Sequence, residues 1–255
     1  MRRNWTKEEL ILAFNLYLKI PFGKMHKHNP DIIVLANLIG RTPSSISMRL
    51  GNFASVDPYH QERGISGLKG GKKQVQPIWD EFFNNQEELI FLSEEILARK
   101  ENISLEDKYQ EQLYDLKGLI GETVLRTVKT RVNQSVFRQM VLANYNSKCA
   151  ITGIEVPELL LASHIIPWSK NEKERLNPEN GLCLSATFDK AFDRGFIGID
   201  SDLTIIFSPK LKEFSKKNFF NETFEKHEGH QLAIPSKYPP NQEFIKYHLD
   251  HIFNK

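Results

Sequence analysis

The chain has 255 residues, of which 40% are hydrophobic and 26% charged, so it holds enough apolar mass for a buried core in one or two domains. No apolar run approaches the roughly 18 to 20 residues of a membrane span. The two cysteines, Cys149 and Cys183, exclude a disulfide scaffold and a four-cysteine zinc ribbon. Glu8 and Glu9 follow the N-terminus before any long apolar segment, so we expect no secretory signal and a cytoplasmic location.

The net charge of +2 is unevenly distributed along the chain. Residues 1–73 carry 12 Lys/Arg and 5 Asp/Glu, a net +7, whereas residues 74–120 carry 4 and 11, a net −7. A basic N-terminal segment favours a polyanionic partner. The alternative is that these charges form an ordinary solvated surface, and the charge count alone does not decide between the two.

Three short helices are predicted in the basic segment. Thr6 and Glu9 have the spacing of a capping box, and apolar residues follow at helical intervals. A second helix is expected over residues 32–39, after a proline in its first turn, and Gly40 ends it. Thr42 is placed to cap a third helix.

The short turn between the second and third helices is typical of a helix-turn-helix, whose second helix faces the major groove of DNA. The side chains presented to DNA would be Arg41, Ser44, Ser45, Ser47 and Arg49. A small three-helix bundle without a DNA-binding role uses the same turn, so that alternative stays open. Residues 64–73 are predicted to be a flexible basic linker, which is either a tether or a phosphate-backbone contact through Lys69, Lys72 and Lys73.

Residues 76–118 are acidic and helical in pattern. The apolar side chains in this part are expected in the core or on a dimer face: Trp79, Phe82, Phe83, Leu89, Phe91, Leu92, Ile96 and Leu97. A further helix is expected from about Val132 to Tyr145. Beyond it the predicted elements are short strands over residues 149–153 and 159–162, a helix over 186–194, a hairpin over 196–207 and a last helix over 241–253.

Four polar residues between positions 164 and 193 are the candidates for catalysis and metal binding. His164 is expected at a strand end and Asn180 after a polar loop, while Asp189 and Asp193 are four residues apart and therefore share one helix face. Two carboxylates suit Mg²⁺ or Mn²⁺, and a neighbouring histidine can take a proton from water at neutral pH. A metal and a base together are what phosphodiester hydrolysis needs.

Three stretches of this part resemble the HNH endonuclease family, in the branch found in restriction endonucleases. They read SHIIP at 163–167, NGLCL at 180–184 and FDKAFDRG at 188–195. The lead-in R-x-x-Q-x-x-F-R at 131–138 and CAITG at 149–153 also resemble that branch, and the likeness extends over about residues 126–207. The resemblance implies a ββα-metal fold of two strands, a loop and a helix around one metal ion.

By position, the resemblance assigns the general base to His164 and the motif asparagine to Asn180. The third motif position is Asp189, where most members have histidine, and an additional ligand of some members falls on Asp193. Colicin-type members also use the residue before the base, which here is Ser163, a poor ligand. These departures leave the ligand set open but do not affect the location of the site.

Several residues around this motif have two interpretations. Asp193 is either a metal ligand or an ion-pair partner of Arg194 or another nearby basic residue. Lys190 and Arg194 either hold a DNA phosphate or are ordinary surface charges. Cys149 and Cys183 are expected to be buried packing residues rather than metal ligands.

The sequence therefore predicts an α+β protein with a helical DNA-binding segment at 1–73, a helical connector at 74–125 and an HNH nuclease domain at 126–255. The expected function is Mg²⁺- or Mn²⁺-dependent hydrolysis of double-stranded DNA by a restriction or defence endonuclease, with no membrane partner. Cutting both strands with one centre per chain favours a homodimer. The alternative is a DNA-binding regulator whose nuclease centre has decayed.

Overall fold

The computed structural model describes residues 3–65, 70–108, 122–235 and 237–254. Contacts divide the chain into two compact units, Met1–Val136 and Phe137–Lys255. The predicted three-part division of the chain stays a prediction. None of the described helices combines the length and apolar character that a membrane span requires.

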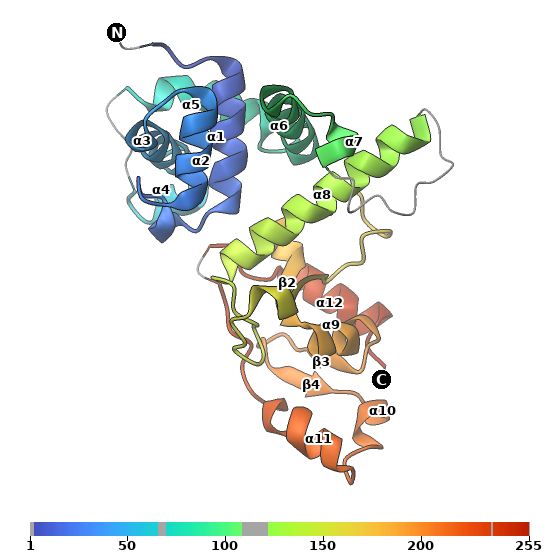
Figure 1. The fold of residues 1–255 in the computed structure, drawn as a ribbon. Helices are drawn as coiled ribbons and strands as arrows, with labels where there is room; N and C mark the ends of the chain where they lie inside the picture. Colours follow the sequence, from blue (N-terminus) through green and yellow to red (C-terminus); the bar gives the residue numbers. More distant parts are fainter. Residues whose placement is uncertain (1–2, 66–69, 109–121, 236, 255) are drawn as a thin grey trace. The chain divides into compact units, whose positions relative to one another are not determined.

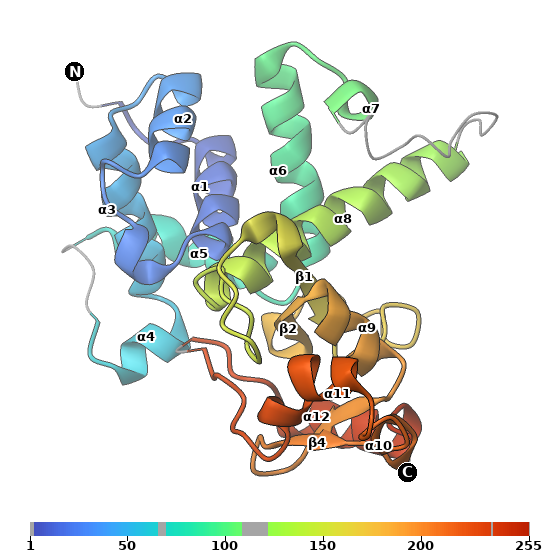
Figure 2. The same cartoon turned by 60° about the horizontal axis from the view of Figure 1, so that its bottom comes forward.

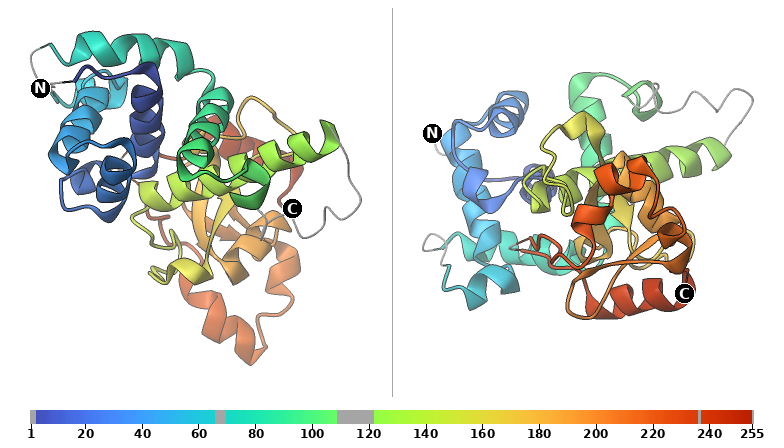
Figure 3. Two further views of the ribbon diagram at one scale, coloured as in Figure 1. Left: turned by 45° about the horizontal axis from the view of Figure 1, so that its top comes forward. Right: turned by 90° about the horizontal axis from the view of Figure 1, so that it is seen from below.

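The first unit is helical throughout its described residues (Figure 1). Its elements are α1 (Lys7–Lys19), η1 (Phe22–Lys24), α2 (Pro30–Ile39), α3 (Pro43–Ala54), α4 (Pro58–Glu62), α5 (Lys72–Phe82), α6 (Gln86–Glu101), α7 (Leu105–Lys108) and the first part of α8 (Glu122–Asn144). The first three α-helices, coloured blue in Figure 3, contact one another.

The predicted helix starts and stops in this unit are confirmed. Thr6 and Glu9 make both hydrogen bonds of a capping box at the start of α1. Gly40 ends α2 in the left-handed conformation at φ +65°, and the Thr42 side chain accepts a hydrogen bond from the backbone of Ser45 to cap α3.

The core of the first unit forms around α1, which contacts α3, α5 and α6. The Phe14 ring stacks on Phe53 at 4.8 Å between centroids and lies 5.1 Å from Trp79. Trp79, Phe82, Leu89 and Ile96 are buried as expected, whereas Phe83 is 38% exposed. Residues on both sides of the predicted linker therefore share one hydrophobic core.

One linker prediction is wrong at its C-terminal end, because α5 begins at Lys72. Val75, Ile78 and Trp79 are buried along one face of this helix, and their burial favours helix over an extended tether. Lys72 and Lys73 are consequently exposed residues of the first turn.

The second unit contains a two-stranded antiparallel sheet with a helix against it (Figure 2). β1 (Leu160–His164) pairs with β2 (Gly181–Ser185) so that His164 lies opposite Gly181, and α9 (Ala186–Asp193) contacts both strands. The remaining elements are η4 (Pro157–Leu159), η5 (Pro178–Asn180), the hairpin of β3 (Ile197–Ile199) and β4 (Ile205–Phe207), α10 (Pro209–Lys212), α11 (Asn218–Thr223), η6 (Glu225–His227) and α12 (Gln242–His251). The predicted α+β fold is confirmed.

The strand predicted at residues 149–153 is wrong, since this segment is a turn. The Cys149 sulfur accepts hydrogen bonds from the backbone amides of Thr152, at 3.3 Å, and Ser185, at 3.2 Å. Gly153 adopts φ +73°, which reverses the chain. Cys149 and Cys183 are both buried, and neither is bonded in a disulfide.

Gly181 lets α8 approach the start of β2 closely. A Cβ atom at this position would lie 2.4 Å from the Val141 side chain and 2.9 Å from the Phe137 ring. Any other residue would therefore push α8 away from the strand that pairs with His164.

Candidate active site

His164, at the end of β1, lies in an aromatic environment that leaves one ring nitrogen free to accept a proton. Its ring stacks on Phe137 at 3.8 Å and meets the edge of Trp168 at 5.4 Å. Its Nε2 lies 2.9 Å from the carbonyl oxygen of Arg175. Because a carbonyl only accepts, Nε2 carries the hydrogen and Nδ1 keeps its lone pair.

The pKa of His164 is below its ordinary value of 6.5. Burial of the ring is the main cause, since it disfavours the charged imidazolium, and the positive charge of Arg175 acts in the same direction. The hydrogen bond to the Arg175 carbonyl opposes this shift. The ring is therefore neutral at pH 7 and can act as a base.

Asn180 holds the loop that carries the Arg175 carbonyl. Its side-chain oxygen accepts from the amide of Ile166 at 2.8 Å, and its side-chain nitrogen donates to the carbonyls of Ile166, at 3.2 Å, and Glu174, at 3.1 Å. Both ends of the loop between β1 and β2 are thereby tied to one buried amide. Asn180 positions His164 through the backbone rather than by direct contact.

Asp189 and Asp193 extend from α9 into a pocket of about 340 Å³ that also contains Ser163 and His164. Burial raises the pKa of Asp189, while the Ser163 hydroxyl lowers it. Partial burial and the negative charge of Asp189 raise the pKa of Asp193. A nearby cation would offset the repulsion that Asp189 exerts on Asp193, so the pocket favours a cation.

The donor atoms at this pocket fit a hard divalent cation. Within the part of the chain that the structure describes, no three His, Cys, Asp or Glu side chains are grouped closely enough to hold a metal. The two carboxylates and the buried Ser163 hydroxyl are all oxygen donors. Mg²⁺ is commonly bound by one or two carboxylates and completes its coordination with water and phosphate oxygens.

Lys190 and Arg194 are exposed and line a second pocket of about 350 Å³, which also includes His164 and Asp193. Among the described residues, Asp193 forms no ion pair with Arg194. The positive charges of Lys190 and Arg194 nevertheless lower the pKa of Asp193, so the ion-pair and metal-ligand interpretations of this residue both stay predictions.

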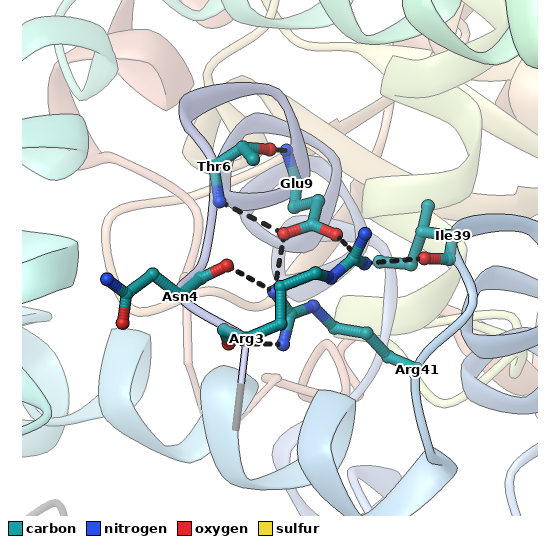
Figure 4. Close-up of polar contacts among 6 residues, drawn as sticks. All are labelled: Arg3, Asn4, Thr6, Glu9, Ile39 and Arg41. Carbon is teal, nitrogen blue, oxygen red and sulfur yellow. Dashed lines mark hydrogen bonds and ion pairs between the residues drawn. The ribbon is translucent and has the colours of Figure 1, made fainter. Parts of the chain in front are cut away.

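The predicted groove-facing arginines of the first unit are engaged within the unit itself. The Arg41 guanidinium pairs with Glu9 at 2.6 Å and donates to the carbonyl of Asn4 at 2.7 Å, while Arg3 pairs with the same carboxylate (Figure 4). Arg49 is 8% exposed, and its guanidinium lies 4.5 Å from the centre of the Trp5 ring.

The remaining predicted DNA-binding residues differ in exposure. Ser44 is exposed, Ser45 is half-buried, and Ser47 donates to the carbonyl of Met25 at 2.6 Å. Lys69 lies outside the described residues. Contact of this set with DNA stays a prediction.

We expect Arg49→Met to stabilise the first unit. The Arg49 Nε and Nη1 atoms are buried, and the side chain makes no hydrogen bond or ion pair with any residue that the structure describes. A buried cation without an anion is unfavourable, so methionine should raise the free energy of unfolding by about 1 kcal/mol. Thermal unfolding of the wild type and the variant measures this difference in stability.

The matched control is Arg41→Met, which removes a partner of the buried Glu9 and should lower that free energy by about 1 to 3 kcal/mol. A loss of stability in Arg49→Met as well would mean that the contact with Trp5 outweighs the burial of the charge.

β1, the loop after it, β2 and α9 have the two-strand, one-helix layout of a ββα-metal fold, with His164 and two carboxylates at one pocket. The family described as HNH endonuclease matches residues 149–200, which include both strands and the helix. This match confirms the family resemblance over these residues and supports a nuclease function. No curated protein matches the chain.

Sequence reasoning missed four parts of the site: the Phe137 and Trp168 rings, the Arg175 carbonyl and His248. Phe137 lies within the lead-in motif at 131–138, so the sequence could have indicated its role. The Arg175 carbonyl is a backbone group, and no residue type in a sequence pattern identifies it. None of the motifs in the sequence falls within residues 210–255, yet His248 of α12 lines the second pocket.

Acid should destabilise the protein partly through His248. Burial lowers its pKa to about 4 from the ordinary 6.5, although Nε2 donates to the Phe192 carbonyl at 3.0 Å. Between these values the unfolded chain binds a proton that the folded chain does not. Stability should therefore rise with pH across this window and be lost as pH falls through it, by about 3 kcal/mol.

The measurement is urea unfolding of the wild type and of His248→Gln at several pH values. Glutamine can still donate to the Phe192 carbonyl but does not titrate, so the variant should lose that part of the pH dependence. His164 contributes in the same direction in both proteins, so only the difference between them is informative. Identical pH profiles would contradict the assignment.

Proposed function

We propose that the protein is a metal-dependent endonuclease that hydrolyses phosphodiester bonds of double-stranded DNA, acting in the cytoplasm as a restriction or defence enzyme. One observation carries the proposal. The Arg175 carbonyl holds the hydrogen of His164 on Nε2, which leaves a neutral Nδ1 base at the pocket that contains the paired carboxylates Asp189 and Asp193.

The proposed reaction uses His164 as the general base. A water oxygen forms a bond to phosphorus as its proton moves to Nδ1, and the bond from phosphorus to the 3′-oxygen breaks. Asn180 keeps the loop, and with it the Arg175 carbonyl, in place during this step. Mg²⁺ or Mn²⁺ held by Asp189, Asp193 and Ser163 would offset negative charge on the phosphate and the leaving oxygen.

The second candidate function is a DNA-binding regulator with an inactive centre, which the aspartate at position 189 in place of histidine would favour. Nicking of supercoiled plasmid with Mg²⁺, with Mn²⁺ and with a chelator separates the two. Metal-dependent nicking supports the enzyme, and DNA binding without nicking under all conditions supports the regulator. A homodimer would provide two centres for the two strands, so linear product should increase with protein concentration relative to nicked product.

We expect the exposed lysines at the start of α5 to contribute to the salt dependence of DNA binding. Deleting residues 1–73 is unsuitable as a test, because α1 and α3 contribute to the core that buries Trp79. Lys72→Gln with Lys73→Gln keeps that core. Each lost phosphate contact should reduce the slope of log affinity against log salt by about 0.9.

The control for this measurement is Lys100→Gln, at an exposed lysine of the acidic α6. An unchanged slope in the double variant would mean that these two lysines do not contact phosphate.

A further inference from the structure

We infer that the second pocket binds the phosphate adjacent to the scissile phosphate on the same DNA strand, an inference that rests on the proposed nuclease function. The pocket has a volume of about 350 Å³. It shares His164, Pro167 and Asp193 with the catalytic pocket. A strand whose scissile phosphate lies beside His164 would continue directly into it.

Two free cations line this pocket. Lys190 and Arg194 are four residues apart at the end of α9 and so lie on one face of the helix. Both are exposed, and neither forms an ion pair within the described part of the chain. A guanidinium and an ammonium on one face can donate to the oxygens of a single phosphate.

Two further lining residues carry no charge: His248 of α12 and Ile252, which directly follows that helix. His248 is 1% exposed, lies 3.7 Å from the Phe192 ring in a stacked arrangement, and donates from Nε2 to the Phe192 carbonyl. It is therefore neutral, and Asp193 is the only acidic residue that lines the pocket.

The C-terminal end of α12 also fixes the backbone that carries Arg194. The amide of Asn254 donates to the Gly195 carbonyl at 3.0 Å, and the Asn254 side chain donates to the Arg194 carbonyl at 2.7 Å. A Cβ at Gly195, where φ is +67°, would lie 2.0 Å from the Ile252 carbonyl oxygen. These contacts hold the backbone of this side of the pocket in place, while the exposed side chains of Lys190 and Arg194 can adjust to a ligand.

The chemistry of the lining favours a phosphate over a nucleobase. Bases bind by stacking on open aromatic faces and by hydrogen bonds to their edges. Two aromatic rings line this pocket, and each is already stacked: His248 on Phe192 and His164 on Phe137. Two cations without an ion-pair partner among the described residues also line it. Phosphate contacts of this kind position a strand without reading its sequence.

The test compares a dinucleotide that has one phosphodiester with the same dinucleotide carrying an additional phosphate at its 5′ or its 3′ end. The readout is the ratio of kcat/KM for the phosphorylated and unphosphorylated substrates, measured with Mg²⁺ or Mn²⁺. We expect one of the two terminal phosphates to raise this ratio about 10-fold in the wild type, the effect of one hydrogen bond between charged groups. The end that gives the increase identifies the side of the scissile bond on which the pocket lies.

The double variant Lys190→Gln with Arg194→Gln should bring this ratio close to one, whatever its activity on the unphosphorylated dinucleotide. The matched control, Lys216→Gln with Lys217→Gln, removes two charges from exposed lysines outside both pockets and should keep the wild-type ratio. A ratio of one in the wild type, or an unchanged ratio in the Lys190/Arg194 variant, would overturn the inference.

Failure of the nuclease function itself gives a different result. If the wild type cuts neither dinucleotides nor plasmid with either metal, the proposed function is wrong. The same ratio can then be measured from the dissociation constants of fluorescent oligonucleotides with and without the terminal phosphate. Loss of this binding ratio in the Lys190/Arg194 variant alone supports the phosphate pocket, and an equal ratio in all three proteins excludes it.

Discussion

Replacing His164 with alanine should reduce DNA cleavage by about 10²- to 10⁴-fold, the range that general acid–base groups contribute. The residue acts in the chemical step, and its ring is held between Phe137, Trp168 and the Arg175 carbonyl rather than at an exposed surface. DNA affinity should therefore stay close to the wild-type value. Single-turnover cleavage and equilibrium binding at one salt concentration give the two numbers.

The same experiment has a pH readout. The base must be neutral, and burial holds the pKa of His164 below 6.5. The cleavage rate of the wild type should therefore be at its maximum near neutral pH and should fall as pH decreases through that lowered pKa. The residual cleavage rate of the alanine variant should not show this inflection. Wild-type cleavage rates in the alanine variant, or an inflection well above 6.5, would rule out His164 as the base.

Local signals explain what could be predicted of the fold. Thr6 and Thr42 cap helices by hydrogen bonds within three residues, and Gly40 ends one through its own backbone, so each signal lies inside the segment that it shapes. The turn at residues 149–153 has local hydrogen bonds, but it also includes a bond from the Ser185 amide to the Cys149 sulfur, across 36 positions. No local pattern reports such a contact, and the apolar sequence reads as a strand.

The same distinction applies to the site. His164, Asn180 and Asp189 could be proposed from motif spacing because the family motif specifies side chains at these positions. Arg41 and Arg49 were predicted to contact the DNA groove, but in the structure Trp5 packs against both of them. Arg41 also pairs with Glu9. These contacts join residues more than 30 positions apart, so a local sequence pattern does not predict them. The sequence gives the number of charges in this segment, but tertiary packing determines which of them can reach DNA.

Asp189→Asn should lower cleavage by more than about 100-fold, since even residues that only support metal ligands cost 10- to 100-fold when replaced. Without metal, the same change should not destabilise the fold. Burial raises the pKa of the Asp189 carboxyl, which means that the ionised form is disfavoured in the folded chain, and the neutral amide removes its repulsion of Asp193. Added Mg²⁺ should raise the thermal midpoint of the wild type but not of the variant.

Two further variants complete the metal titration. Asp189→His introduces the residue common at this family position, and an imidazole ligand should shift the preference from Mg²⁺ towards Ni²⁺ or Co²⁺. Asp193→Asn tests the second carboxylate: if Asp193 is a ligand, high metal concentration should partly restore cleavage, whereas a purely structural residue would lower the thermal midpoint with no metal-dependent recovery. Full activity of Asp189→Asn at low Mg²⁺ would show that the cation is held elsewhere and that the paired carboxylates of α9 are not its site.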